Sequence, residues 1–358
     1  MHVLVTGGLG FLGHAVTREL LATGHRVTVM TRGRSDRTPP PGAELVTGDI
    51  RDRDRVADIV QQGRYGGVVH LAALTSGRDS FADPLGYFDV NATGTLNLLM
   101  ALDAARTTTG PAALVFASTN IVYGSQHHGA LSEDLDPHPE SPYAASKVAA
   151  EQMVAAYAAT GAIGAITVRP FNIAGAVDGV TDTDHARIIP NVFRAITGQL
   201  DHITLNGDGS AVRDFVHVGD LATAVQLALA ACTPGTCQTI NLGSGVGTSM
   251  ATVVATAEQI TGRPVKILRQ PPKPEPPKLI ADISRAHAIL DWAPKRAELG
   301  TILMDAWEAW LNFQVGRDWA ASSRAVVPLS SEPSSGGTLG FRHPKRAREG
   351  SLDRDLRT

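Results

Sequence analysis

Tyr143 and Lys147 stand four residues apart, a spacing that places both side chains on one face of a helix. A phenol has an ordinary pKa of about 10 and is mostly protonated at neutral pH, but a nearby cation stabilises the phenolate and makes it a usable base. Thr119 follows an apolar run at residues 113–118, and its hydroxyl can hydrogen-bond the same substrate oxygen. These residues predict proton transfer at a substrate oxygen.

Gly7, Gly10 and Gly13 have the spacing of a phosphate-binding turn. They follow an apolar β-branched run and open a predicted helix, at whose start stand Phe11 and Leu12. Glycine permits the tight turn and the close approach of backbone to phosphate, and a helix N-terminus offers N–H donors. This context predicts a site for the pyrophosphate of NAD or NADP.

The residues after the second apolar run decide how the adenosine ribose is held. An NAD site would place an acidic residue there, whereas this chain has Thr31, Arg32 and Arg34. Two arginines favour a 2′-phosphate, so both NAD and NADP stay open. Further on, Asp49 and Ile50 suit the adenine ring, with Asp49 accepting from the exocyclic amine; the alternative is that Asp49 caps the helix expected at residues 53–61.

With several further motifs, the chain resembles the extended short-chain dehydrogenase/reductase family, and within it the NAD-dependent epimerases/dehydratases of the UDP-glucose 4-epimerase group. The resemblance covers residues 1 to about 312. It rests on the segments at residues 6–13, 49, 70–73, 91–95, 118–124, 143–147, 169–175, 207–221 and 241–245.

The resemblance implies that Thr119, Tyr143 and Lys147 form a catalytic triad and that Asn172 and Arg213 hold the diphosphate of a nucleotide-sugar. A guanidinium group fits that role because its fork matches phosphate oxygens in two bonds. The resemblance also implies a homodimer formed by the helices at residues 90–105 and 143–160. The other implied contacts are Leu71, Ala72, Ala73, Asn91, Ser118 and Pro170 for the cofactor, and Thr75, Glu275 and Leu279 for the substrate.

Three departures from the family pattern bear on the reaction. Dehydratases carry an acidic pair after the catalytic Ser/Thr, where this chain has Asn120 and Ile121, so dehydration is disfavoured. Pro272 stands at the position of an arginine that binds the substrate diphosphate in the group, and only Lys273 lies beside it. Weaker binding of the diphosphate is therefore expected. Leu279 stands where many epimerases carry a tyrosine near the sugar C2 substituent, so a bulkier group such as N-acetyl is expected to fit.

The sequence therefore predicts a nucleotide-sugar 4-epimerase of the UDP-hexose or UDP-N-acetylhexosamine type. It would act through a transient 4-keto sugar by reversible hydride transfer to tightly bound NAD(P). Arg32 and Arg34 leave open an NADPH-dependent reductase of a 4-keto nucleotide-sugar. A non-catalytic NADP-sensing protein of the same fold is a further alternative, although such proteins often lose the Tyr or Lys that this chain keeps.

The elements that must position these residues are those of an α/β fold with a Rossmann-type doubly wound parallel sheet. Residues 1–175 are predicted to form the NAD(P)-binding domain, with return elements from the second half of the chain. Its expected strands lie at residues 3–6, 26–31, 67–71, 113–118 and 165–169, and its helices at 10–23, 90–105 and 143–160.

Residues 176–315 are predicted to form a smaller α+β lobe that binds the nucleotide-sugar. Its expected strands lie at 203–205 and 238–241, and its helices at 187–197, 218–230 and 248–261. The prolines of residues 270–277 predict an extended segment. Residues 320–358 are rich in Ser, Gly, Pro and Arg and are predicted to be a disordered tail.

Composition narrows the choice of partners. The 358-residue chain carries a net charge of −3, which provides no broad basic field for nucleic acid. No apolar run approaches the ~18 residues that cross a bilayer, so no membrane contact is expected. The N-terminus enters a strand directly, which favours a cytoplasmic protein. The two cysteines, Cys232 and Cys237, lack a second ligand pair, so no metal site is expected.

Overall fold

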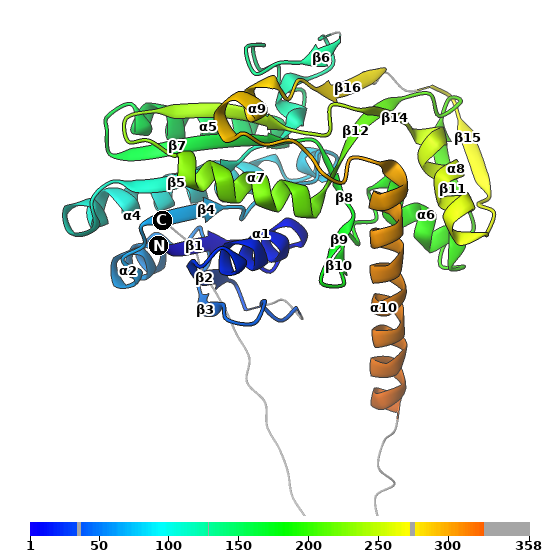
Figure 1. The fold of residues 1–358 in the computed structure, drawn as a ribbon, viewed down its shortest axis with the longest axis horizontal. Coiled ribbons are helices and arrows are strands. Elements are labelled where there is room, and N and C mark those ends of the chain that lie inside the picture. Colours follow the sequence, from blue (N-terminus) through cyan, green and yellow to red (C-terminus); the bar gives the residue numbers. More distant parts are fainter. Residues whose placement is uncertain (34–36, 128, 273–275, 326–358) are drawn as a thin grey trace, which may run out of the picture. The chain divides into compact units, whose positions relative to one another are not determined.

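The computed structural model describes residues 1–33, 37–127, 129–272 and 276–325 (Figure 1). Its main sheet has seven parallel strands in the order β13-β7-β5-β4-β1-β2-β3. The strand order reverses between β1 and β4, which is the doubly wound arrangement that the sequence predicts. The strands are β1 (His2–Thr6), β2 (Arg26–Thr31), β3 (Glu44–Thr47), β4 (Gly67–His70), β5 (Ala112–Ala117), β7 (Ile163–Pro170) and β13 (Cys237–Leu242).

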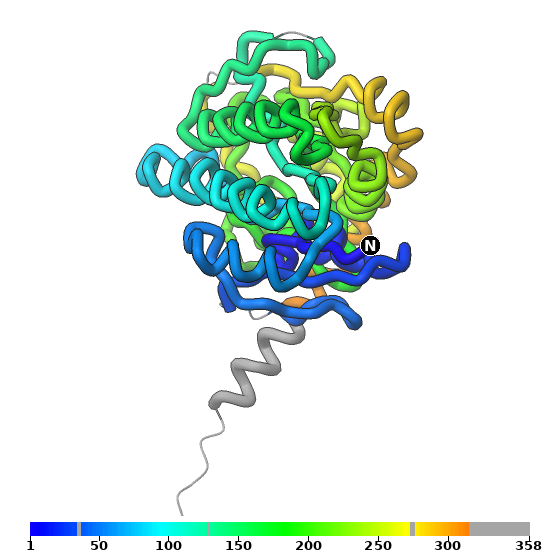
Figure 2. The backbone as a smooth tube through the Cα atoms, turned by 90° about the vertical axis from the view of Figure 1, so that its left-hand side faces the viewer, coloured from blue at the N-terminus to red at the C-terminus, as the bar shows by residue number. Residues whose placement is uncertain are grey.

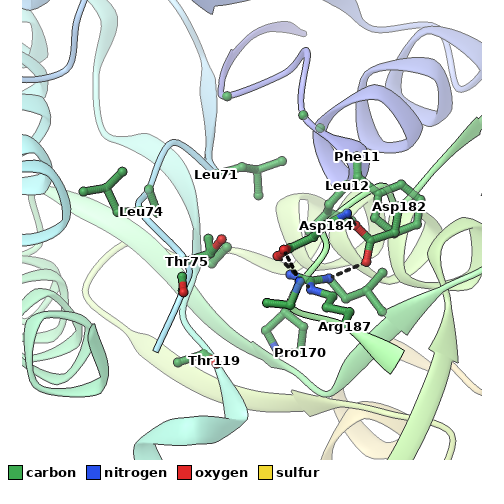
Figure 3. A pocket seen from close by; sticks show the side chains of 18 of the residues that line it. Phe11, Leu12, Leu71, Leu74, Thr75, Thr119, Pro170, Asp182, Asp184 and Arg187 are labelled. Atoms are coloured by element: carbon green, nitrogen blue, oxygen red, sulfur yellow. Dashed lines mark hydrogen bonds and ion pairs between the residues drawn. The ribbon is translucent and has the colours of Figure 1, made fainter. Parts of the chain in front are cut away.

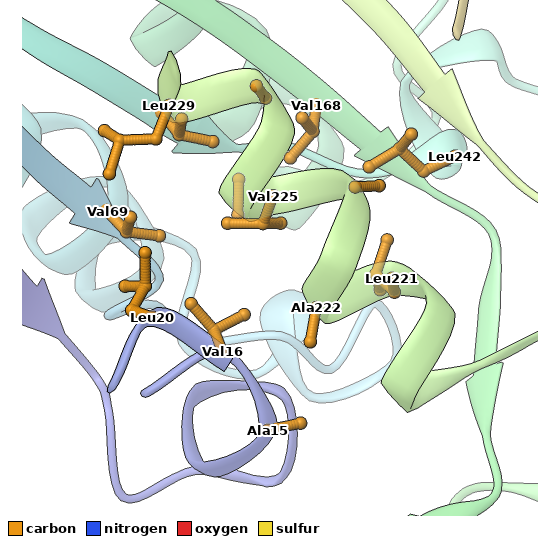
Figure 4. Close-up of a cluster of buried hydrophobic side chains, with 14 of the residues drawn as sticks. Ala15, Val16, Leu20, Val69, Val168, Leu221, Ala222, Val225, Leu229 and Leu242 are labelled. Atoms are coloured by element: carbon orange, nitrogen blue, oxygen red, sulfur yellow. The ribbon is translucent and has the colours of Figure 1, made fainter. Parts of the chain in front are cut away.

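One face of the sheet is covered by α1 (Phe11–Ala22), α7 (Val218–Ala231) and α9 (Ser284–Leu290). Val16 and Leu20 of α1 lie with Val225 and Leu229 of α7 over Val69 of β4 (Figure 4). Each such side chain, when fully buried, contributes about 1.5–3 kcal/mol of transfer free energy. This packing holds α1 rigidly behind the turn that the glycines form.

The opposite face is covered by α2 (Arg53–Gly63), α4 (Gly94–Thr109) and α5 (Pro142–Ala158). Figure 2 shows these three helices one after another, and α4 contacts both of its neighbours. The predicted helix at residues 90–105 divides here into a π-helical turn, Asp89–Thr93, and α4. Between β4 and this turn lie a 3-10 turn, Asp79–Phe81, and α3 (Pro84–Phe88).

The second lobe has a separate hydrophobic core. Phe193 of α6 (Ile188–Ile196) packs there against Trp310 of α10 (Leu299–Ala325), and both side chains are about 1% exposed. Strands β14 (Gly247–Ser249), β12 (Val212–His217), β16 (Lys278–Ala281) and β6 (Ala130–Leu131) form a small sheet, and β8 (Asn172–Ala174) also pairs with β12. The remaining elements are β9 (Ala176–Val177), β10 (Val180–Thr181), α6 (Ile188–Ile196), β11 (Ile203–Asn206), α8 (Met250–Thr261), β15 (Ile267–Gln270) and α10 (Leu299–Ala325).

The structure changes the predicted domain plan in three respects. The return elements expected from the second half of the chain are residues 218–230 and 238–241, which were assigned to the smaller lobe; they form α7 and β13 of the main sheet layer, because β13 pairs with β7 and α7 packs on α1. Met1–Gly316 form one compact unit, so the two predicted parts are lobes of a single body. Residues 320–325, expected in the tail, continue α10, and residues 326–358 lie outside the described residues.

Candidate active site

A cavity of about 1050 Å³ opens at the carboxyl ends of the central strands (Figure 3). This edge of a doubly wound sheet is where ligands bind, because the strand order reverses there and the connecting loops diverge. The cavity brings together most of the residues that the sequence singles out. They are Gly7, Gly10, Phe11, Leu12, Gly13, Thr31, Arg32, Asp49, Ile50, Leu71, Ala72, Ala73, Thr75, Ser118, Thr119, Tyr143, Lys147, Pro170, Asn172 and Arg213.

The glycine turn is a backbone cradle that side chains would fill. Gly7 has φ +73°, and a Cβ there would lie 2.8 Å from the backbone nitrogen of Ala72. A Cβ on Gly13 would overlap the carbonyl oxygen of Gly7, so the start of α1 packs directly on the turn. Gly10, the N-cap of α1, has no side chain to cap the helix, and the first turn of α1 contains no acidic residue. The N–H groups at this helix end are therefore suited to an anionic ligand.

The structure contradicts the interpretation of Asp49 as a helix cap. The residue that caps α2 is Asp52, whose carboxylate accepts a hydrogen bond from the backbone N–H of Arg55. Asp49 lines the cavity instead, and Arg51 binds its carboxylate through Nη2 at 2.8 Å and through the backbone N–H at 3.0 Å. These bonds lower the pKa of Asp49 to about 2. Asp49 is thus an ionised acceptor at neutral pH.

Thr31 and Arg32 also border the cavity, and the Arg32 side chain is exposed. Arg34, the second arginine that favours NADP, lies outside the described residues.

Tyr143 and Lys147 lie in the first turns of α5, on one face as their spacing predicts. Ser141 caps this helix by accepting from the backbone N–H of Ala144, and Pro142 occupies the first turn. The two catalytic candidates are 4% and 2% exposed. The Nζ atom of Lys147 lies 4.7 Å from the ring centroid of Phe116, and burial lowers the pKa of Lys147 to about 8.

Burial raises the pKa of the Tyr143 phenol above its ordinary value. A hydrogen bond with the Thr119 side chain acts in the opposite direction, which supports the predicted pairing of these two hydroxyls. The cation that lowers the pKa of Tyr143 in the described structure is Arg187, whereas the sequence predicted this role for Lys147.

A buried ion pair fixes α5 against the sheet one turn beyond Lys147. Arg169 of β7 donates to Glu151 through Nε at 3.0 Å and Nη2 at 2.6 Å. The guanidinium carbon lies 4.8 Å from the ring centroid of Tyr123, whose hydroxyl donates to Asn241. All four residues are at most 9% exposed. Because Pro170 follows Arg169 directly, this network sets the cavity wall relative to Tyr143.

Two predicted contact residues do not line the cavity. Asn91 is buried beside it and bonds both backbone atoms of Leu74 and the hydroxyl of Ser146, so it positions the wall rather than touching a ligand. Leu279 packs against a hydrophobic cluster that includes Phe171 and Leu131 and does not line the cavity, so its predicted effect at the sugar C2 substituent stays a prediction.

The nucleotide-binding candidates have defined positions. The Asn172 Nδ2 atom donates to the carbonyl oxygen of Asp214 at 3.0 Å. Arg213 donates through Nη1 to the carbonyl oxygens of Val212 and Pro276 at 2.8 and 2.9 Å. Pro272 does not line the cavity, and Lys273 and Glu275 lie outside the described residues.

A charged group that the sequence analysis missed also lines the cavity. Arg187 lies 3.2 Å from a carboxylate oxygen of Asp182 and 3.5 Å from one of Asp184 (Figure 3). These residues occur in the irregular segment before α6, where neither periodicity nor a motif indicates that they face the same space as Tyr143. Arg37 and Arg78 complete the cavity's unpredicted charged residues among those described.

Within the described residues, no group of three or more His, Cys, Asp or Glu side chains is placed to hold a metal ion. The same part of the chain contains no helix long and apolar enough to cross a membrane.

Comparison with known proteins extends this description. The model of the NAD dependent epimerase/dehydratase family matches residues 3–243. A UDP-glucose 4-epimerase of Streptomyces lividans is 37% identical over 85% of this chain and 94% of its own length. The structure of UDP-glucose-4-epimerase from Stenotrophomonas maltophila, with bound NAD and formylated UDP-arabinopyranose, has a TM-score of 0.82 at 32% identity, over 88% of this chain and 99% of that one. MoeE5 in complex with UDP-glucuronic acid and NAD gives 0.76 at 28% identity, over 87% and 100%.

Proposed function

Because this chain belongs to the NAD-dependent epimerase/dehydratase family, we propose that it inverts the configuration at C4 of a UDP-linked hexose or N-acetylhexosamine. The observation that carries the proposal is a convergence of groups in one cavity. Tyr143, Lys147 and Thr119 face the same space as the glycine turn, and that space continues to Arg213. The cavity therefore has a place for a dinucleotide, a reacting sugar and a second diphosphate.

The chain's own residues account for the proton transfer. Tyr143, as phenolate, takes the proton of the C4 hydroxyl, and Thr119 holds the same oxygen by a hydrogen bond. Lys147 lies one helical turn further along α5 and is buried. A bound dinucleotide would supply the acceptor, and later the donor, of the C4 hydride. The returned proton comes from Tyr143, so the cycle involves no net oxidation.

Inversion requires that the keto sugar present its other face before the hydride returns. Arg213 and Asn172 would hold the substrate by its diphosphate, away from the reacting carbon. A grip confined to the diphosphate leaves the hexose ring free to turn. The hydride then returns to the opposite face of C4.

The described residues fit a dinucleotide. Gly7 and Gly13 leave the space that a pyrophosphate needs, and α1 presents its uncapped N-terminus to it. Asp49 is an ionised acceptor suited to the adenine amine. The related structures from Stenotrophomonas maltophila and Brucella ovis contain NAD. Arg32 at the ribose end supports NADP as well, so the choice of cofactor is tested below.

We also propose that the protein is a homodimer. Large apolar side chains are 36–79% exposed on consecutive elements that contact one another, and such a patch marks an interaction surface. Leu96→Glu combined with Met100→Glu should convert the dimer to a monomer in light scattering. The control is Leu45→Glu, which changes an exposed leucine on β3. The patch comprises Phe81, Leu85, Phe88, Leu96 and Met100.

The deciding experiment incubates the purified protein with UDP-glucose, UDP-galactose and their N-acetyl forms, without added reductant. Chromatography of the products should show interconversion of a C4-epimeric pair. Arg32 supports a second candidate, an NADPH-dependent reductase of a 4-keto nucleotide-sugar. Conversion of none of these sugars, together with stoichiometric NADPH consumption on a 4-keto nucleotide-sugar, would establish the reductase instead.

A further inference from the structure

A carboxylate–guanidinium–carboxylate cluster lines the cavity, and the proposed reaction gives its two carboxylates no role. It consists of Asp182, Arg187 and Asp184, which extend into the cavity on the side opposite Leu74 and Thr75 (Figure 3). Arg187, Asp182 and Asp184 line the same cavity as Tyr143, and the charge of Arg187 lowers the pKa of the Tyr143 phenol, so the cluster can act on a sugar bound at that phenol.

The backbone around the cluster holds its carboxylates in place. Asp182 accepts from the backbone N–H of Asp184 at 3.0 Å, and Asp184 accepts from that of Ala186 at 2.9 Å. Arg187 forms the N-cap of α6, whose apolar face is buried in the core of the second lobe. The cluster is therefore anchored at both ends and cannot withdraw without rearranging this segment.

The two carboxylates differ in how far they are compensated. Arg187 lies nearer to Asp182, and Arg37 also interacts with the charge of Asp182. Asp184 has its ion pair with Arg187 at 3.5 Å and keeps 40% of its side chain exposed, against 13% for Asp182. The negative charge that a ligand in the cavity meets is thus mainly that of Asp184.

Other cations also line the cavity. Arg37 interacts with the charge of Asp182, Arg78 is exposed on the segment after β4, and Lys147 is only 2% exposed. Arg213 is engaged with the carbonyl oxygens of Val212 and Pro276 and, in the proposed function, with the substrate diphosphate. A carboxylate on the sugar would have to compete with Asp182 and Asp184 for Arg187.

We propose that the Asp182–Arg187–Asp184 cluster is a specificity determinant that admits a neutral hexose and rejects a hexuronic acid. This inference rests on the proposed function and names its substrate class. Carboxylate oxygens accept hydrogen bonds from sugar hydroxyls, so a neutral hexose gains contacts at the cluster. A hexuronate instead brings a like charge toward Asp184, and repulsion of this kind excludes a competing ligand.

Coulomb's law sets the scale of the expected discrimination. A unit charge about 8 Å away, at an effective dielectric constant of about 20–40, changes a dissociation constant by roughly ten-fold. UDP-glucuronate should therefore bind about ten-fold or more weakly than UDP-glucose. Added salt should narrow this ratio, because Asp184 is partly exposed to solvent.

The test measures dissociation constants of UDP-glucose and UDP-glucuronate by calorimetric titration of the full chain saturated with NAD. Asp184→Asn keeps the shape and capping ability of the side chain and should reduce the ratio of the two constants about ten-fold. Asp182→Asn should reduce it less, and Arg187→Met should widen it. Asp178→Asn is the matched control, because Asp178 pairs with Arg18 and does not line the cavity.

Two results would overturn the inference. One is a wild-type protein that binds UDP-glucuronate as tightly as UDP-glucose. The other is an Asp184→Asn variant that changes both affinities equally and leaves their ratio unaltered. The ratio of the two dissociation constants is measured by binding alone, so it tests this inference without any turnover. A reductant-free assay that shows no interconversion would refute the proposed function separately.

Discussion

Lys147 has opposite expected effects on stability and on catalysis. Its pKa falls from 10.5 to about 8 because burial disfavours the ammonium form. At about 1.4 kcal/mol per pH unit, this difference corresponds to roughly 3 kcal/mol by which the folded protein is destabilised at neutral pH. Lys147→Met replaces the buried ammonium group with an apolar side chain of similar length. We expect a gain of about 1–3 kcal/mol in unfolding free energy. The gain is smaller than the full cost of burying the charge because the contact with Phe116 is lost. Turnover should fall strongly.

The pH dependence distinguishes this explanation from improved packing. Between pH 8 and 10.5 the folded state binds fewer protons at Lys147 than the unfolded state, so wild-type stability at this group rises with pH. The advantage of Lys147→Met should be complete below pH 8 and should vanish as the pH approaches 10.5. Near pH 10.5 the buried Lys147 of the wild type is neutral, so burying it no longer lowers the free energy of unfolding.

Urea unfolding followed by tryptophan fluorescence at pH 7 and pH 10 measures the effect. Lys266→Met, which changes an exposed lysine, is the matched control and should show no such difference. A Lys147→Met protein that is less stable than wild type at pH 7, or whose stability difference is the same at both pH values, would refute the reasoning. In that case the ammonium group is not a destabilising element of the fold.

Three further substitutions test the site. Tyr143→Phe should reduce turnover by ~10²-fold or more while cofactor affinity stays within a few-fold, and near-normal kcat would contradict its role in proton transfer. Arg32→Ala should weaken NADP by about 1.5–3 kcal/mol in fluorescence titration and barely change NAD; equal effects on both cofactors would show that Arg32 does not read the 2′-phosphate. Gly13→Ala should abolish dinucleotide binding, because its methyl group would overlap the Gly7 carbonyl oxygen; normal affinity in the same titration would show that the turn adapts.

The sequence determined the parts of this protein that depend on short spacings. The glycines at 7, 10 and 13 lie within one turn and the start of one helix, so their geometry follows from local backbone rules. Tyr143 and Lys147 share a face of α5 because the helical repeat places them there. The five strands expected before residue 175 are present because continuous β-branched apolar runs favour buried parallel strands.

Tertiary structure decided the questions on which local patterns were silent or ambiguous. Asp49 and Asp52 both precede α2, and the backbone geometry at the helix start alone makes Asp52 the cap and leaves Asp49 at the cavity. Asn91 belongs to a segment that matches the family pattern, yet its amide donates hydrogen bonds to Leu74 and Ser146 and does not line the cavity. Neither outcome could be inferred from residue type, because each depends on which backbone groups the fold brings within hydrogen-bonding distance.

The most distant assignments also required the fold. Residues 218–242 return to the main sheet as α7 and β13, because β7 offers an edge to which β13 pairs in parallel register. Leu279 was expected at the sugar but packs against the hydrophobic cluster of Phe171 and Leu131 and does not line the cavity. Arg187 follows an irregular segment without periodicity, and it lines the same cavity as Tyr143 because α6 of the second lobe begins there. Contacts between segments so far apart are set by how buried surfaces pack, which no local spacing encodes.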